Sequence, residues 1–140
     1  DAAIRASFLH LDHATGRAAM VRAVLEGVTH AVRDSYDALT GTGTRIESLI
    51  AVGGGSRSDY WLKAIATSLG LPISVPVAGD FGGAFGAARL AMMAASGAGA
   101  EIATAPRIAK TIEPDTTLAS AFAEAHARYS AAYSALKGLT

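Results

Sequence analysis

The sequence predicts an α/β domain with a small, mostly parallel sheet packed against helices. Two short apolar runs, 46–52 and 73–77, have the length and continuity of strands that are covered on both faces. The segment between them, about 58–69, has helical periodicity. A strand, helix and strand of this length close by a right-handed crossover, which makes the two strands parallel.

The segments before the first apolar run predict a short strand and a long helix. Residues 7–11 alternate between apolar and polar, as a half-buried strand does. A helix is expected from residue 15 or 16 to 39, with Thr15 as its N-cap, and the glycine- and threonine-rich segment 40–44 ends it. Apolar residues at intervals of three and four predict the face that lies on the core: Val21, Leu25, Val28, Val32, Tyr36 and Leu39.

Three more segments complete the predicted order. The helix at 58–69 ends at Gly70 and Pro72, with Trp61, Ile65 and Leu69 on its buried face. A helix at about 83–95 is rich in alanine, which predicts close packing, and 96–114 is expected to be irregular surface. A last helix is expected over 116–136, and its inward residues are Leu118, Phe122, Ala125, Tyr129 and Tyr133.

The length of 140 residues suits one domain, or a piece of one. Two or three strands make a poor sheet alone, so we expect residues 1–140 to be most of one domain, truncated from a longer chain whose upstream strands complete the sheet. The composition, 51% hydrophobic and 17% charged, excludes a disordered chain.

The charge balance argues against nucleic acid or an anionic membrane as a partner. Twelve basic residues balance twelve acidic ones, and the pI is about 7.1. The chain has no cysteine, which rules out a disulfide framework or a thiolate metal site. No apolar run approaches the roughly 20 residues of a membrane helix, and no signal pattern begins the chain, so a cytoplasmic location is expected.

The feature that points most directly to chemistry is a glycine turn between the first apolar run and the next helix. Gly53, Gly54 and Gly55 follow a buried strand, where glycine lets a ligand approach the backbone and a helix N-terminus offers N–H donors. Tight packing of strand on helix explains the same glycines equally well. A dinucleotide fingerprint, with Asp80 as the ribose-binding acid, would make the chain a Rossmann-type NAD enzyme, but Ser58 stands where that motif has glycine or alanine. A Walker loop fails, because no lysine closes the run.

Residues 53–61, Gly-Gly-Gly-Ser-Arg-Ser-Asp-Tyr-Trp, resemble the adenosine-binding signature of FGGY carbohydrate kinases. The xylulokinase branch of that family typically reads Gly-Gly-Gly-x-Arg-Ser-x-x-Trp. Two further segments lie at the family's spacing: 22–28 on the preceding helix and 83–91 on the following one. The resemblance covers roughly residues 5–95.

The resemblance implies the C-terminal, actin-like (ribonuclease H-like) domain of a two-domain kinase that uses ATP with Mg²⁺. By carry-over, the residues that line the nucleotide are Gly53, Gly54, Gly55, Ser56 and Asp59, with Asp59 near the adenine in place of the asparagine of glycerol kinases. Gly83, Ala84 and Ala87 would let the third helix lie close beside that pocket.

The resemblance places the general base and the phosphate loops of the family upstream of the matched region, so no catalytic residue is expected in this chain, which alone should be inactive. Its partners would be ATP or ADP and a sugar, bound through an N-terminal domain that is missing here. D-Xylulose, converted to D-xylulose 5-phosphate, is the expected substrate. Another FGGY kinase, gluconokinase- or ribulokinase-like, and a non-catalytic nucleotide-binding or oligomerisation module are the alternatives.

Other residues favour structural roles. His10, His13, His30 and His126 are expected to be surface or hydrogen-bonded histidines rather than metal ligands. Arg22 and Glu26 are spaced as an ordinary i, i+4 pair. Tyr129 and Tyr133 have a spacing that suits an intramolecular face or the surface of a homodimer.

Overall fold

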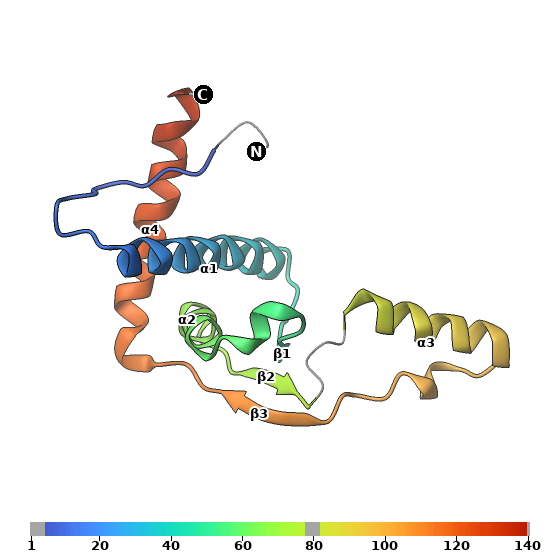
Figure 1. Cartoon of the computed structure of the whole chain (residues 1–140). Coiled ribbons are helices and arrows are strands. Elements are labelled where there is room, and N and C mark those ends of the chain that lie inside the picture. The colour runs from blue at the N-terminus through green and yellow to red at the C-terminus, as the bar shows by residue number, and fades with distance from the viewer. Residues whose placement is uncertain (1–4, 78–81, 140) are drawn as a thin grey trace.

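The structure is a computed structural model that describes residues 5–77 and 82–139. Its four α-helices are α1 (Arg17–Gly41), α2 (Asp59–Leu69), α3 (Gly83–Ser96) and α4 (Ala119–Leu136), and its strands are β1 (Leu49–Ile50), β2 (Ile73–Pro76) and β3 (Ile108–Ile112). Helix α2 lies between α1 and the sheet, and α4 crosses α1 (Figure 1), which it contacts around His30 and Asp34. The α/β class predicted from the sequence is confirmed.

The sheet has the order β1, β2, β3. Strands β1 and β2 are parallel, with Leu49 opposite Ile73 and Ile50 opposite Ser74, as the crossover through α2 requires. Strand β3 is antiparallel to β2 and pairs Ile112 with Ile73, with an irregularity at Val75 and Pro76, where proline supplies no N–H donor. Because β3 lies within 96–114, the prediction of irregular surface there was wrong.

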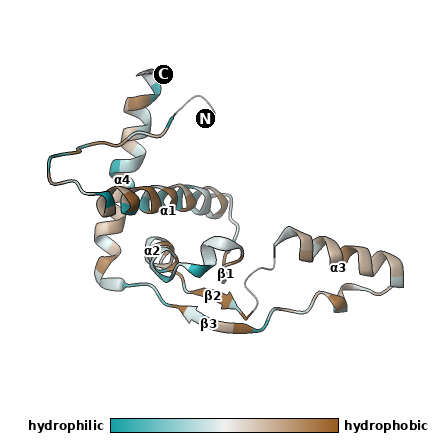
Figure 2. Ribbon diagram, viewed as in Figure 1, coloured by the Kyte–Doolittle hydropathy of each residue, from teal (hydrophilic) through white to brown (hydrophobic). Residues whose placement is uncertain are grey.

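The buried core lies between α2 and the sheet. Its members are Leu62, Ala66, Ile73 and Val75, with Leu49, Ala51, Ile65 and Ile112 partly buried around them. Figure 2 shows β2 coloured as hydrophobic where it faces this layer. The buried face of α2 is therefore centred on Leu62 and Ala66, while the predicted residues Trp61, Ile65 and Leu69 flank it and are half-buried.

The predicted range of α2, about 58–69, agrees with the structure to within one residue. The side chain of Ser58 accepts a hydrogen bond from the N–H of Trp61 as N-cap, and Gly70 ends the helix in the left-handed conformation. Thr15 does not cap α1. Gly16 is its N-cap, and the Thr15 hydroxyl instead accepts from the N–H of Asp12 and donates to its carboxylate, which closes the turn before the helix.

Helix α1 covers α2 with one narrow face. Thr29 and His30 are its buried residues, and of the predicted stripe Leu25, Val32 and Tyr36 are half-buried. The other three members of the stripe, Val21, Val28 and Leu39, are exposed. The periodicity therefore located the helix and its approximate face, but half of the apolar stripe stays exposed within the described residues.

Helix α3 lies apart from the other helices (Figure 1). None of its residues is buried, and Leu90 and Met92 are more than half exposed. Gly83, Ala84 and Ala87, which were expected to pack closely beside the glycine turn, are exposed. Small side chains permit close packing, but the described part of the chain provides no partner for this face.

The N-terminal segment also departs from expectation. Residues 5–14 form no strand, and the side chains of Phe8, Leu9 and Leu11 are exposed. The alternation of 7–11 is not accompanied by a neighbouring strand, and a strand needs such a partner for its backbone hydrogen bonds. Within the described residues, no helix combines the length and the apolar character needed to cross a membrane.

Candidate functional site

The glycine turn follows β1 after Ala51 and Val52 and leads into α2. Gly53 has φ 81° and ψ −174°, a backbone conformation open essentially only to glycine. A 3-10 helix, Gly54–Arg57, comes next, and Ser56 closes it by donating from its N–H (3.1 Å) and its hydroxyl (2.7 Å) to the carbonyl of Gly53. Ser56 is buried, so its hydroxyl holds the shape of the turn from inside.

Trp61 packs against this turn. A β-carbon built on Gly55 would lie 2.8 Å from Cζ3 and 3.3 Å from Cε3 of the Trp61 ring, closer than real β-carbons approach. The absence of a side chain at Gly55 is therefore explained by packing within the protein. Trp61 is half-buried, which agrees with the expected core role, and its buried Nε1 has no hydrogen-bond partner among the described residues.

Gly54 differs from both neighbours. No atom lies within 4 Å of a β-carbon built there, its φ is not positive, and the residue is exposed. The same fold thus gives three glycines three different situations: Gly53 is needed for its backbone conformation, Gly55 for the indole ring, and Gly54 for neither. Gly54 is the position where an approaching group would meet bare backbone.

Asp59 is the first residue of α2 and is directed to the sheet edge. Its carboxylate lies 2.5 Å from Nζ of Lys110 on β3, and both side chains are substantially exposed. Sequence reasoning did not find Lys110, because it is 51 residues away along the chain and reaches Asp59 only through the antiparallel pairing of β3 with β2.

A second polar group joins α1 to α2 next to the turn. One oxygen of Glu26 accepts from Nε of Arg22 at 2.6 Å and from the hydroxyl of Tyr60 at 3.0 Å. Burial, followed by the hydrogen bond to Glu26, raises the pKa of Tyr60, and the hydrogen bond to Glu26 raises the pKa of Arg22. The i, i+4 pair of Arg22 and Glu26 predicted from the sequence is therefore present. Glu26 also connects α1 to α2 through its hydrogen bond with Tyr60.

An open depression of about 400 Å³ lies beside this group. It is lined by Arg17, Ala18, Val21, Arg22, Leu25 and Tyr60. The glycine turn does not line it, so the five predicted nucleotide-binding residues are assembled as a surface turn and not as the wall of this depression.

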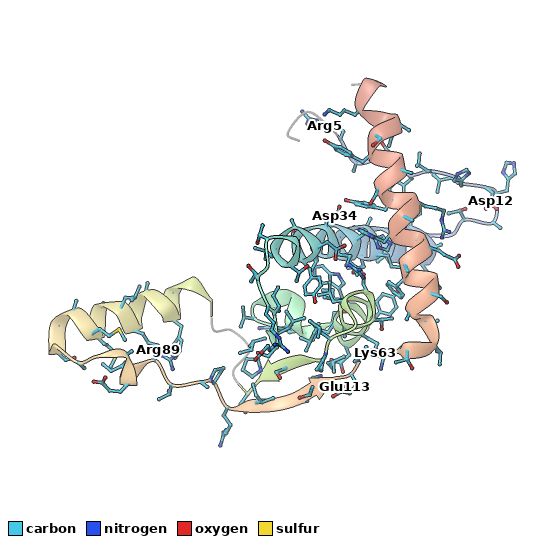
Figure 3. The ribbon with its side chains drawn as sticks, turned by 180° about the vertical axis from the view of Figure 1, so that it is seen from behind. Arg5, Asp12, Asp34, Lys63, Arg89 and Glu113 are labelled. Carbon is cyan, nitrogen blue, oxygen red and sulfur yellow. The ribbon has the colours of Figure 1, made fainter. Side chains whose placement is uncertain are left out.

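The histidines fall into two sets. His10 and His13 are exposed in the N-terminal segment. His30 on α1 and His126 on α4 face each other with ring centroids 5.9 Å apart, and His126 contacts Asp34 at 2.6 Å. Figure 3 shows Asp34 on α1 near the crossing with α4. In the described ranges, no group of three or more His, Cys, Asp or Glu side chains could hold a metal ion. Asp80, the acid of the dinucleotide alternative, lies outside the described residues.

A strand, a glycine turn and a capped helix in an α/β layer define a class of domain that presents bare backbone at the carboxyl end of a strand. Within that class, the model of the C-terminal domain of the FGGY family of carbohydrate kinases matches residues 1–95. The chain belongs to this family.

Individual relatives agree. Over 89 residues the chain is 37% identical to the xylulose kinase of Escherichia coli (strain K12), a match that covers 64% of this chain and 18% of that protein. The crystal structure of a xyloylose kinase from Brucella ovis superposes with a TM-score of 0.90 at 57% identity and covers 100% of this chain and 29% of that one. The xylulose kinase of Rhodospirillum rubrum gives 0.80 at 30% identity, covering 95% and 28%. The chain thus spans less than a third of the length of these relatives.

Proposed function

We propose that this chain forms the adenosine-binding wall of an ATP-dependent sugar kinase, with Gly53, Gly54, Gly55, Ser56 and Asp59 lining the nucleotide. The observation that carries the proposal is the exposed backbone of Gly54, which lies at the end of a sheet strand and has no protein atom near its Cβ direction. Membership of the FGGY family supports it. Backbone without a side chain lets a ligand such as a nucleoside approach it closely.

In this role the residues of the chain bind and orient, and perform no chemistry. The buried Ser56 and the φ of Gly53 hold the turn rigid, and rigid placement of the nucleotide is a large part of catalysis in phosphoryl transfer. ATP, with its accompanying Mg²⁺, supplies the phosphoryl group. The resemblance to the family assigns the sugar site and the general base to a region outside this chain, and the chain spans less than a third of the length of these relatives.

The proposed acceptor is D-xylulose, giving D-xylulose 5-phosphate. Support comes from the names of the relatives, since three of those described above are xylulose or xyloylose kinases. D-Ribulose, D-gluconate and glycerol are the comparison substrates in an assay of ADP formation by the full-length protein. The proposal requires the highest kcat/KM with D-xylulose, and a preference for another of these sugars would replace it with another kinase of the family.

Gly54 provides the test of the nucleotide site. In the full-length protein, Gly54→Trp should abolish ADP binding in calorimetry, because its side chain fills the space above the turn. Gly54→Ala, which meets no atom, is the matched control and should fold and bind nearly as the parent does. Unchanged ADP affinity in Gly54→Trp would refute the site, and binding of NAD without ADP would refute the kinase assignment.

A further inference from the structure

The ion pair between Asp59 and Lys110 places a balanced charge at the start of α2. Asp59 is in the first turn of the helix, where the negative charge of a carboxylate interacts favourably with the helix dipole. Lys110 comes from β3, which lies outside the residues that the family model matches, and its Nζ is 2.5 Å from Oδ1 of Asp59. Asp59 is 64% exposed and Lys110 46%, so both charges act on whatever approaches this surface.

A lone carboxylate here would oppose the proposed function. Asp59 follows the glycine turn by four residues, and the nucleotide proposed to bind there carries two to four negative charges on its phosphates. Like charges repel over distances up to about the Debye length of ~10 Å. Neutralising Asp59 therefore favours an anionic nucleotide without requiring any direct contact with it.

Lys110 is the cation that meets this need. The other lysine near Asp59, Lys63, stands one helical turn further along α2 (Figure 3), and its charge acts on the carboxylate of Asp115. The hydrogen bond from Lys110 also holds the Asp59 side chain against β3, which fixes its rotamer.

We infer that Lys110 is a positioning residue for nucleotide binding: it cancels the charge of Asp59 and holds that side chain against the sheet, so that the glycine turn accepts a nucleoside polyphosphate. This inference rests on the proposed function. In this role Lys110 does not contact the nucleotide and acts only through Asp59. The loss of affinity in a Lys110 variant must therefore increase with the negative charge of the ligand.

The test compares charged and uncharged ligands in the full-length protein. Lys110→Ala and Lys110→Met should bind ADP and ATP about threefold to tenfold more weakly at low salt and should lose less affinity for adenosine, which carries no phosphate charge. The loss should shrink at high salt. In an Asp59→Asn background, where no carboxylate is left unpaired, Lys110→Ala should cost less ADP affinity than it does in the parent. Lys63→Ala is the matched control and should leave all three affinities unchanged.

Each outcome of these binding measurements either supports or overturns the inference. Unchanged ADP binding in both Lys110 variants would overturn the inference, as would equal losses for ADP and adenosine, or an equal cost of Lys110→Ala with and without Asp59→Asn. If the parent protein binds neither ADP nor adenosine, the proposed function fails together with the inference. If the parent binds both and the Lys110 variants match it, only the inference fails. Thermal unfolding of each variant confirms that the fold is intact.

Discussion

The indole ring of Trp61 occupies the space in which Gly55 would carry a side chain, with Cζ3 2.8 Å from the position of a β-carbon. The motif that joins the glycine turn to the tryptophan six residues later is thus a packing unit. The strand end, the turn and the first turn of α2 are fixed to one another by this contact and by the Ser58 cap. Two neighbouring glycines consequently have opposite tolerance for substitution.

Gly55→Ala should lower the free energy of unfolding by about 1–3 kcal/mol, because the methyl group forces the indole ring or the turn to move. Gly54→Ala should change it by less than about 0.5 kcal/mol. Urea unfolding measures both. In a Trp61→Phe background the smaller ring gives way, so the cost of Gly55→Ala should fall, and the coupling appears in the double-mutant cycle. Equal midpoints for Gly55→Ala and Gly54→Ala would contradict the packing role.

Gly53→Ala tests the backbone rather than the packing. The φ of 81° with ψ −174° has no comfortable equivalent for an L-residue, so we expect a loss of about 1–3 kcal/mol although no atom lies near the new methyl group. Gly27→Ala, inside α1 with an open Cβ direction, should instead stabilise the protein by about 0.5–1 kcal/mol. A stability gain from Gly53→Ala would show that the turn adopts another conformation.

The local signals of the sequence were sufficient for the segments around the site. Helical periodicity and Gly70 predicted α2, and the apolar run 73–77 predicted β2, because these patterns are formed by residues close together in the chain. The alternation at 7–11 misled because period-two patterning does not establish that a partner strand exists. Strand β3 was missed because four of its five residues are exposed and only the β-branched Ile108, Thr111 and Ile112 indicated it.

The sequence predicted the position of the glycine turn, but it did not predict the tertiary contacts around that turn. The spacing from Gly53 to Trp61 located the turn, but which glycine faces the indole ring depends on the rotamer of Trp61. The pairing of Asp59 with Lys110 depends on the register of β3 on β2. Contacts of this kind are set by tertiary packing, which no local pattern encodes.

Glu26 should be the most sensitive member of the polar group between α1 and α2. Glu26→Ala removes the acceptor of both Arg22 and Tyr60, and we expect a loss of about 1 kcal/mol in the free energy of unfolding. Arg22→Ala should cost at most about 0.5 kcal/mol, since that side chain is exposed. Tyr60→Phe removes only the hydrogen bond between α1 and α2. Its loss in the free energy of unfolding should be smaller than that of Glu26→Ala and larger than that of Arg22→Ala. A larger effect for Arg22→Ala than for Glu26→Ala would contradict the shared acceptor.

His30 should make the stability of the α1–α4 contact depend on pH. Burial, followed by the charge of His126, lowers the pKa of His30 below its ordinary 6.5, and Arg128 acts in the same direction, while Glu26 and Asp34 partly offset the shift. Below pH 6.5 the unfolded chain therefore binds more protons at this residue than the folded protein. Its contribution to stability is complete above pH 6.5 and is lost progressively as the pH falls below that value.

The measurement is the thermal midpoint between pH 5 and 8, roughly the range in which histidine titrates. His30→Leu should flatten the decline on the acid side, because the buried imidazole, whose Nδ1 has no hydrogen-bond partner, is replaced by a side chain that does not titrate. His13→Leu alters an exposed histidine and is the matched control, so it should retain the decline of the parent. If His30→Leu keeps the full acid-side decline, the pH dependence arises elsewhere and the buried imidazole is not its source.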